Sequence, residues 1–279
     1  MAKLHETQNP FAVFLMTFIF SLSLITSVKS DSFSFSIHNF QADAQNIFLA
    51  GDAKASNEVL RLTKTDPKGF PLKHSVGLSI FEGVIHLSDR KTGRVANFNT
   101  EFNFMVNTEG ATLHGDGFAF FLAANEIEIS SNSSGGFLGL FNYITAFKTT
   151  ANPIVAVEFD SFANQWDPSF PVLNSPHIGI DINSIRSVAT APWTLDVQPI
   201  GIVGKARISY QSSSKILTVS VAYPDSPVNS NVTVLSYPVD LGAVLPEWVI
   251  VGFAAATGDV RERTRTINEA NATIFSIGS

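Results

Sequence analysis

The most informative stretch of the chain reads Val155-Ala-Val-Glu-Phe-Asp-Ser-Phe-Ala-Asn-Gln-Trp-Asp-Pro168 and resumes as His177-Ile-Gly-Ile-Asp181. It opens as an alternating apolar run, which predicts a strand that is buried on at least one face. Side chains two residues apart on a strand point to the same side, so Glu158, Asp160 and Phe162 share one face. A polar loop follows, and a second strand is predicted from His177.

This stretch brings together carboxylates, an amide and an imidazole. Oxygen ligands suit Ca²⁺, and a mixture of carboxylate and imidazole suits Mn²⁺ or a similar metal. Glu158 and Asp160 interrupt an apolar strand, and the next basic residue along the chain is Arg186. Buried carboxylates are costly without a cation, so we predict a paired metal site that shapes the loop. The alternative is a solvated acidic face beside an ordinary histidine.

Similar short runs recur along the whole chain and predict further strands. They occupy 32–37, 46–52, Val76–Phe81, Gly83–Leu87, Phe98–Val106, Gly117–Ala123, Phe137–Phe141, Ile154–Phe159, His177–Ile182, Ala206–Tyr210, Ile216–Val221, Trp248–Phe253 and Thr273–Ile277. No stretch of useful length has a helical repeat, and Gly, Pro, Asn and Ser separate the runs. This pattern predicts an all-β sandwich of antiparallel sheets, with Gly117–Ala123, which is entirely apolar, as a central strand. The 24 phenylalanines suit its inner faces.

The first 30 residues have the features of a secretory signal peptide. Lys3 lies in the polar start, Phe11 to Ile25 is an apolar run, and Val28-Lys29-Ser30 precedes the expected cleavage point. The run is short for a membrane span and no second one follows, so we expect a secreted protein, extracellular or vacuolar. Residues 31–279 contain no linker, repeat or charge block and are predicted to form one domain.

Composition sets further bounds. The chain of 279 residues has no cysteine, so a secreted form must rely on a large core rather than on disulfides. With 24 acidic and 18 basic residues, it offers no basic stripe for nucleic acid. Three sequons, at Asn132, Asn231 and Asn271, are candidates for N-glycosylation.

Several longer motifs carry a family resemblance that covers nearly all of residues 31–279. They are Ser32-Phe-Ser-Phe35, Asn46-Ile-Phe-Leu-Ala-Gly-Asp52, Asp116-Gly-Phe-Ala-Phe-Phe121, Gly135-Gly-Phe-Leu-Gly-Leu-Phe141, Val155-Ala-Val-Glu-Phe-Asp160, His177-Ile-Gly-Ile-Asp-Ile-Asn-Ser184 and Leu245-Pro-Glu-Trp-Val249. In these motifs the chain resembles the legume lectins. The resemblance implies a jelly-roll-like β-sandwich that binds mono- or oligosaccharides and glycoproteins without altering them. It also implies a homodimer or homotetramer.

The resemblance assigns the metal ligands. It implies Ca²⁺ bound by Asp160, the backbone carbonyl of Phe162, Asn164 and Asp167. It implies Mn²⁺ bound by Glu158, Asp160, Asp167 and His177, with Ser187 reaching that ion through water. All of these residue types are present, and the charge of two ions would allow three carboxylates to lie together.

The resemblance also implies a carbohydrate-binding site beside the Ca²⁺. Asp116 would accept hydrogen bonds from sugar hydroxyls, Asn164 and the backbone N–H of Gly136 would donate them, and the ring of Phe162 would face the sugar. From the residues alone, Phe162 is equally consistent with an aromatic residue of the core, and Gly136 with a glycine required by a turn. The loop that includes Gly258 and Asp259 would set sugar preference.

Three departures from the family pattern stand out. Gly115 replaces the usual alanine before Asp116, in a peptide bond that the family has in cis. The segment between Asp167 and His177 is longer than expected. The stretch from Asp259 to Thr266 is predicted to be a long charged loop before the last strand.

Two other functions remain to be weighed. Some sandwich-fold glycoside hydrolases have a second glutamate shortly after the first acids of such a strand, but the matching positions here are Phe162 and Ala163, which cannot act as acid or nucleophile. We therefore expect a protein that is not an enzyme. The other possibility is a lectin-like storage or defence protein that has lost sugar binding.

Overall fold

The computed structural model describes residues 32–108, 114–125, 129, 132–168, 172, 175–193, 202–226, 232–260, 263–267 and 273–278. The predicted signal peptide and two of the sequon residues, Asn231 and Asn271, lie outside these ranges. Residues from Ser32 onward form one compact unit. Within the described ranges, no helix is long and apolar enough to span a membrane.

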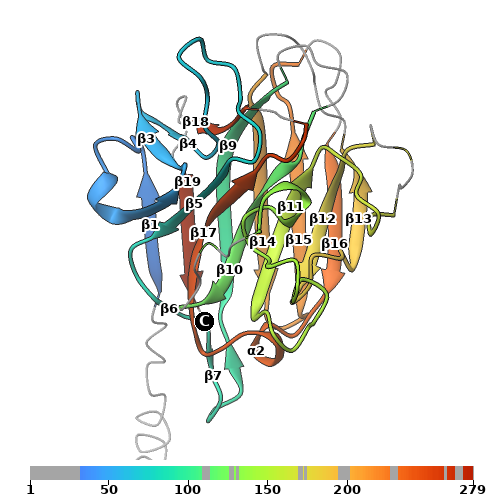
Figure 1. The fold of residues 1–279 in the computed structure, drawn as a ribbon. Helices are drawn as coiled ribbons and strands as arrows, with labels where there is room; N and C mark the ends of the chain where they lie inside the picture. Colours follow the sequence, from blue (N-terminus) through green and yellow to red (C-terminus); the bar gives the residue numbers. More distant parts are fainter. Residues whose placement is uncertain are drawn as a thin grey trace, which may run out of the picture. The chain divides into compact units, whose positions relative to one another are not determined.

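The described part of the chain is built from two large antiparallel sheets (Figure 1). The nine-stranded sheet contains β1 (Phe33–Ile37), β3 (Lys54–Ser56), β4 (Val59–Arg61), β9 (Asn97–Asn107), β14 (Gly204–Gln211), β15 (Ile216–Ala222), β16 (Thr233–Pro238), β18 (Arg263–Ile267) and β19 (Thr273–Gly278). Its main path runs β16-β15-β14-β9-β18-β4-β3, and β19 joins β1 to β9.

The eight-stranded sheet carries the predicted site. It contains β2 (Ile47–Gly51), β5 (Val76–Phe81), β6 (Ile85–His86), β10 (Gly117–Ala124), β11 (Ile154–Asp160), β12 (His177–Ile182), β13 (Ala189–Pro192) and β17 (Trp248–Ala256). Its main path runs β13-β12-β11-β10-β17-β5-β2, so β10 is central, as its apolar sequence predicts. The remaining elements are β7 (Ser88–Asp89), β8 (Arg94–Val95), the 3₁₀ turns η1 (Ala44–Asn46) and η2 (Gly135–Phe137), and the helix α2 (Leu241–Val244).

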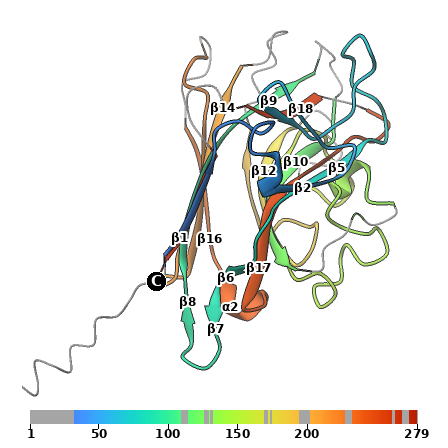
Figure 2. The same cartoon turned by 90° about the vertical axis from the view of Figure 1, so that its left-hand side faces the viewer.

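The two sheets pack face to face, and Figure 2 shows them edge-on. Phenylalanines dominate the layer between them. Phe118 and Phe159 stack with ring centroids 4.4 Å apart, and Phe104 lies 5.2 Å and 5.1 Å from them. Each fully buried ring of this kind contributes about 1.5–3 kcal/mol to stability. The predicted all-β antiparallel sandwich is therefore confirmed.

The eight-stranded sheet is buried on both faces. On β10, Phe118 and Phe120 belong to the core between the sheets, whereas Ala119 and Phe121 belong to a second apolar cluster on the outer face. Leu140, from the chain segment that follows η2, completes this outer cluster. The loops that follow β10 cover this face in yellow-green in Figure 1. A third layer thus lies over the sheet, and it explains why the strands are continuously apolar.

Most predicted strands are present, with small changes at their ends, but some predictions were wrong. Phe137–Phe141 is not a strand: Phe137 ends the 3₁₀ turn η2, and residues 138–140 continue as turns. Gly83–Leu87 contributes only the two-residue β6 to the sheet, with β7 beginning after it. Six short strands (β3, β4, β7, β8, β13 and β16) were not predicted, and neither was α2.

The predicted charged loop from Asp259 to Thr266 is also wrong in part. Arg263–Ile267 forms β18, which pairs with β9 on one side and with β4 on the other. The sequence of this segment alternates arginine and threonine, a period of two that is typical of a strand. Reading the segment for its charge alone concealed this alternation.

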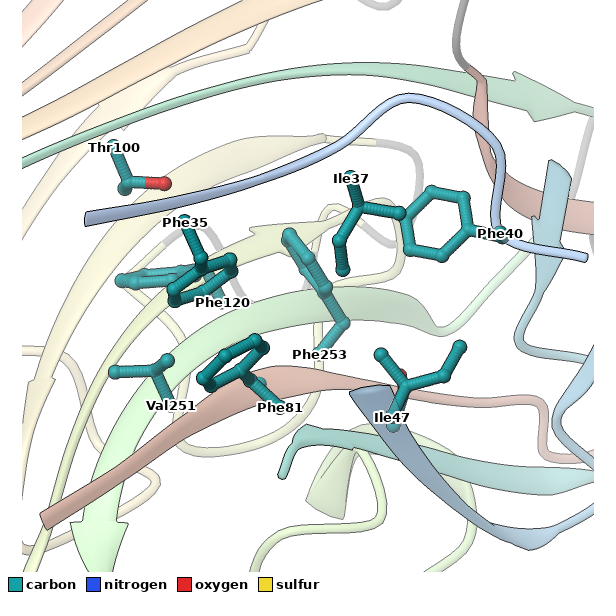
Figure 3. A pocket seen from close by; sticks show the side chains of 11 residues that line it. Phe35, Ile37, Phe40, Ile47, Phe81, Thr100, Phe120, Val251 and Phe253 are labelled. Atoms are coloured by element: carbon teal, nitrogen blue, oxygen red, sulfur yellow. The ribbon is translucent and has the colours of Figure 1, made fainter. Parts of the chain in front are cut away.

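A small apolar cavity of ≈ 20 Å³ lies between the sheets beside β1 (Figure 3). Phe35 and Phe81, whose rings stack with centroids 3.6 Å apart, lie on one side of it. Such a space has room for about one water molecule, and a sugar ring does not fit. Among the residues labelled in Figure 3, Thr100 is the one that has a side-chain oxygen, and it is 1% exposed.

Thr100→Val tests the packing around this cavity. The Thr100 hydroxyl has no hydrogen-bond partner among the described residues. Replacing it by a methyl group of the same shape should raise the free energy of unfolding by about 1 kcal/mol, measured by urea denaturation. The control is Thr218→Val, because Thr218 is on the same sheet and bonds Ser236 in an exposed pair. Its effect should stay within about 0.5 kcal/mol. Destabilisation by Thr100→Val would contradict this account.

Candidate metal and carbohydrate site

The predicted metal residues lie on the outer face of the eight-stranded sheet. On β11, Val157 and Phe159 point into the core between the sheets, so Glu158 and Asp160 point to the opposite side. On β12, Ile178 belongs to the same core, and His177 therefore shares the outer face with the two acids. The alternation that predicts the strand also places these three side chains together.

Strand pairing sets the spacing of these ligands. Asp160 lies opposite His177 across the β11–β12 ladder. Ligand atoms of Glu158, Asp160 and His177 all lie within 4.8 Å of one another, and the residues are only 1%, 1% and 4% exposed. His177 Nε2 is 3.1 Å from Glu158 Oε1. This group has the ligand types and the spacing to hold a metal ion.

The loop after β11 turns back and adds two more polar side chains. The Phe162 N–H donates to Asp160 Oδ1 at 2.7 Å, and the Asn164 N–H donates to Asp167 Oδ2 at 2.5 Å. The Asp167 N–H in turn donates to the Asn164 carbonyl at 3.0 Å. These bonds form a tight turn that places Asn164 and Asp167 beside the strand acids.

Several oxygens in this cluster are well suited to a cation. Asp160 Oδ2, Asn164 Oδ1 and Asp181 Oδ2 are buried and have no hydrogen-bond partner among the described residues. Buried carboxylate and amide oxygens of this kind are costly unless something positive satisfies them. The residues present therefore fit a group of hard metal ions with mostly oxygen ligands.

The acid–base properties of the cluster follow from burial and crowding. Burial, together with the charges of Glu158 and Asp167, raises the pKa of Asp160 well above its usual value. Burial and Glu158 likewise raise the pKa of Asp167 to about 7 and that of Asp181 well above the usual range. Burial alone would lower the pKa of His177, but the hydrogen bond and negative charge of Glu158, with Asp167, raise it. Burial therefore favours the protonated forms of Asp160, Asp167 and Asp181, and a nearby cation would oppose this effect.

Two residues of this cluster, Asp181 and Gly179, were not among the predicted site residues, whereas Ser187 was predicted to reach the Mn²⁺ ion through water. Asp181 is completely buried opposite Ala156, and Ser187 Oγ lies 2.8 Å from Asp181 Oδ1 and also contacts Glu158 Oε1. Gly179 faces Glu158 across the ladder, and a side chain there would overlap both Glu158 and Ser187. A glycine inside an apolar strand is the sequence signal for such a close approach, and it was overlooked.

Asp116 lies at the start of β10, next to the metal cluster. Its carboxylate is buried, and the peptide bond that joins it to Gly115 is cis, as the family resemblance implies. Ser161 holds this turn, because its N–H and its hydroxyl donate to the Asp116 carbonyl at 2.9 Å and 3.1 Å. Gly117, the next residue, pairs with Asp160 on one side and with Ala256 on the other. The ends of β10, β11 and β17 therefore meet here.

At two positions a glycine is required because the backbone lies too close to a polar side chain to allow a Cβ. A Cβ on Gly136 would overlap the side-chain amide of Asn164. A Cβ on Gly258 would lie 2.8 Å from Asp116 Oδ2 and 3.2 Å from the Cα of Gly135. The structure thus brings Asp116, Gly136, Asn164 and Gly258 together from four separate segments.

The remaining predicted residues lie at the border of this group. Phe162 is half-buried, and its Cβ would be 2.7 Å from a Cβ on Gly115. Val260 Cγ2 would be 3.0 Å from the same position, so glycine at 115 leaves space for two packed neighbours. Asp259 is 91% exposed in its side chain and lies 3.6 Å from His74 Nε2, outside the buried group.

Comparison with known proteins identifies the family to which this arrangement belongs. The family described as "Legume lectin domain" matches residues 32–271. The chain belongs to the legume lectin family. Lectin 8 of Medicago truncatula is 57% identical over 261 residues, which cover 93% of each chain. Agglutinin-2 of Cladrastis kentukea is 45% identical over 261 residues, 92% of this chain and 87% of the relative.

Solved legume lectin structures show the same fold. Lectin I-B4 of Griffonia simplicifolia, in its metal-free form, has a TM-score of 0.76 and 39% identity over 88% of this chain and 98% of its own. The lectin of Bauhinia forficata, in complex with GalNAc, has a TM-score of 0.74 and 35% identity over 89% and 98%. Legume lectins bind carbohydrate and generally bind metal, and the relatives are named as lectins or agglutinins. This legume lectin is accordingly not an enzyme.

The raised carboxyl pKa values give a prediction for the metal-free protein. Because folding raises the pKa of Asp167 from 3.8 to about 7, the folded state holds more protons than the unfolded state in that range. Stability of the chelator-treated protein should therefore fall as the pH rises from about 5 to about 7, and thermal denaturation would measure it. The stability of protein saturated with Ca²⁺ and Mn²⁺ should instead rise over the same pH range, since ion binding requires deprotonated ligands. Equal slopes of stability against pH for the metal-free and metal-saturated protein would contradict this prediction.

Gly179→Ala should weaken metal binding. The added methyl group would displace Glu158 and Ser187, and disturbance of this kind lowers metal affinity by roughly 10–100-fold. Isothermal titration of the metal-free protein with Mn²⁺ measures the change. The matched control is Thr190→Ala, because Thr190 lies opposite Gly179 on the other neighbouring strand. Unchanged Mn²⁺ affinity in Gly179→Ala would exclude a site built on Glu158.

Proposed function

We propose that this protein is a secreted lectin that binds glycans non-covalently and depends on Ca²⁺ and Mn²⁺. The observation that carries the proposal is the buried cluster of acids, with partnerless oxygens on Asp160 and Asn164 among the described residues, directly beside Asp116. Membership of a carbohydrate-binding family supports the same reading.

The positions of all the metal ligands that the family resemblance implies are compatible with metal binding. Asp160, the carbonyl of Phe162, Asn164 and Asp167 would hold Ca²⁺. Glu158, Asp160, Asp167 and His177 would hold Mn²⁺. The bound ions supply positive charge that keeps the crowded carboxylates ionised. Asp181 and Ser187 border the proposed Mn²⁺ ligand Glu158 and orient it.

The sugar-binding groups each have a chemical task. Asp116 accepts hydrogen bonds from two hydroxyls, because an ionised carboxylate has only acceptors. The Asn164 side chain donates through its NH₂ while its oxygen faces the cation, and the Gly136 N–H adds a further donor. The half-buried ring of Phe162 gives an apolar surface for the C–H groups of a pyranose.

The ligand class is a hexopyranose, free or at the end of a glycan. Among the relatives, lectin UEA-II is described in complex with galactose and the Bauhinia lectin with GalNAc, whereas a Centrolobium tomentosum relative is described as mannose/glucose-specific. In the loop beyond Gly258, Val260 packs towards Gly115. We propose that this loop determines which of these sugars the protein binds. A dimer or tetramer and passage through the secretory pathway, to the cell exterior or the vacuole, complete the proposal.

Asp116→Asn tests the proposed function together with chelation. The variant retains the shape of the side chain but replaces one acceptor oxygen by a donor, so binding should fall by at least about 10-fold. The measurement is glycan-array binding by the full-length secreted protein in Ca²⁺ and Mn²⁺, after EDTA, and after both ions are restored. Binding should disappear with EDTA and return with the ions.

The control variant is Asp66→Asn, which changes a half-buried loop carboxylate that accepts hydrogen bonds from the backbone N–H groups of Lys68 and Phe70. It should bind like the wild type. Binding that survives complete metal removal would overturn the metal dependence. No binding by the wild type in metal-replete buffer would instead identify a storage or defence relative that has lost sugar recognition.

A further inference from the structure

Asn132 begins the segment that leads into the carbohydrate site. It is followed by Ser133 and Ser134, which complete a sequon. Asn132 is exposed and has φ = 62°, a left-handed conformation that asparagine tolerates better than most residues. The next residue is anchored, because Ser133 is 2% exposed and its carbonyl accepts the Gly139 N–H at 2.8 Å. The Asn132 side chain is therefore presented to solvent from a fixed turn.

The other end of this segment contacts the sugar-binding groups. A Cβ on Gly135 would lie 3.7 Å and 3.9 Å from the two carboxylate oxygens of Asp116. The Gly135 N–H donates to the Thr257 carbonyl at 3.2 Å, which ties the segment to the residue before Gly258. Four residues span at most about 14 Å, so Asn132 lies within that distance of Gly136. An attached glycan is bulky and would easily reach the mouth of the site.

We propose that Asn132 carries an N-linked glycan that borders the sugar site and restricts it to small or terminal sugars. This inference rests on the proposed function, because it requires passage through the secretory pathway and a working sugar site. The consequence is a size filter: a monosaccharide passes the glycan, whereas a branched oligosaccharide on a protein surface meets it.

The attachment chemistry is a glycosyl transfer from a lipid-linked oligosaccharide pyrophosphate by a membrane enzyme of the secretory pathway. A bond forms between Asn132 Nδ2 and the anomeric carbon of the first sugar. The bond from that carbon to the phosphate oxygen breaks, the lipid pyrophosphate leaves, and the amide loses one proton to a base of the enzyme. Ser134 supplies the hydroxyl that the sequon requires at the second following position.

Three variants separate the glycan from the side chains around it. Asn132→Gln and Ser134→Ala both abolish the sequon, whereas Ser134→Thr changes the same position and retains it. Ser134 makes no side-chain capping bond to η2, so its replacement removes no capping hydrogen bond from that turn. Each full-length chain is secreted from a eukaryotic host, and thermal denaturation checks that it is folded.

Two measurements are made on each protein. Mass spectrometry of the Asn132 peptide gives occupancy, which should be high in the wild type and in Ser134→Thr. Titrations use free galactose, free mannose and a glycoprotein with branched N-glycans. Loss of the glycan should leave monosaccharide affinity within about twofold and raise affinity for the glycoprotein by about tenfold or more.

The outcomes distinguish this inference from the proposed function. An unmodified Asn132 in the secreted wild type overturns the inference, even if sugar binding is normal. A modified Asn132 whose removal changes neither affinity overturns the size filter. If neither glycosylated nor glycan-free protein binds any of the probes, the proposed function fails and the filter fails with it.

Discussion

Mutual repulsion among buried carboxylates is the constraint on which this structure depends. Glu158, Asp160, Asp167 and Asp181 lie on or beside the outer face of one sheet, each no more than 7% exposed. The imidazole of His177 accompanies them. Four such groups cannot all be ionised in an apolar setting unless cations lie between them. The loop that follows β11 is organised by the same groups, because its backbone N–H donors point at Asp160 and Asp167.

The sandwich makes this arrangement possible by providing rigid strands whose ends meet. β10 pairs with β11 on one side and with β17 on the other, so the turns at Asp116, Asn164 and Gly258 start from neighbouring strands. Glycines at 136 and 258 then allow backbone to approach side chains closely. A site built in this way is positioned by sheet register rather than by loop flexibility, which gives the precision that polar recognition of a ligand requires.

Much of this was predictable from local pattern. The bounds of β12 and the start of β11 follow from alternation, and the outward direction of Glu158 and Asp160 follows from the same period. Features that depend on distant contacts were not predictable. Gly115 is a glycine because Phe162 and Val260, far apart in the sequence, both pack there, and no local pattern shows this. Likewise, β18 is recognisable as a strand only beside β9 and β4, and the segment after η2 folds into turns because it covers a second apolar face.

The burial of the metal cluster also has a kinetic consequence. Glu158, Asp160 and His177 are only 1–4% exposed, so an ion held by them would have little direct contact with solvent. Exchange of such an ion would require a local opening of the residues around it, and openings of this kind occur over microseconds to seconds or longer. The half-life of the loaded state is set by that opening, separately from the equilibrium affinity. A protein of this design can keep its ions through a transient fall in their concentration and lose them only when the depletion outlasts the opening time.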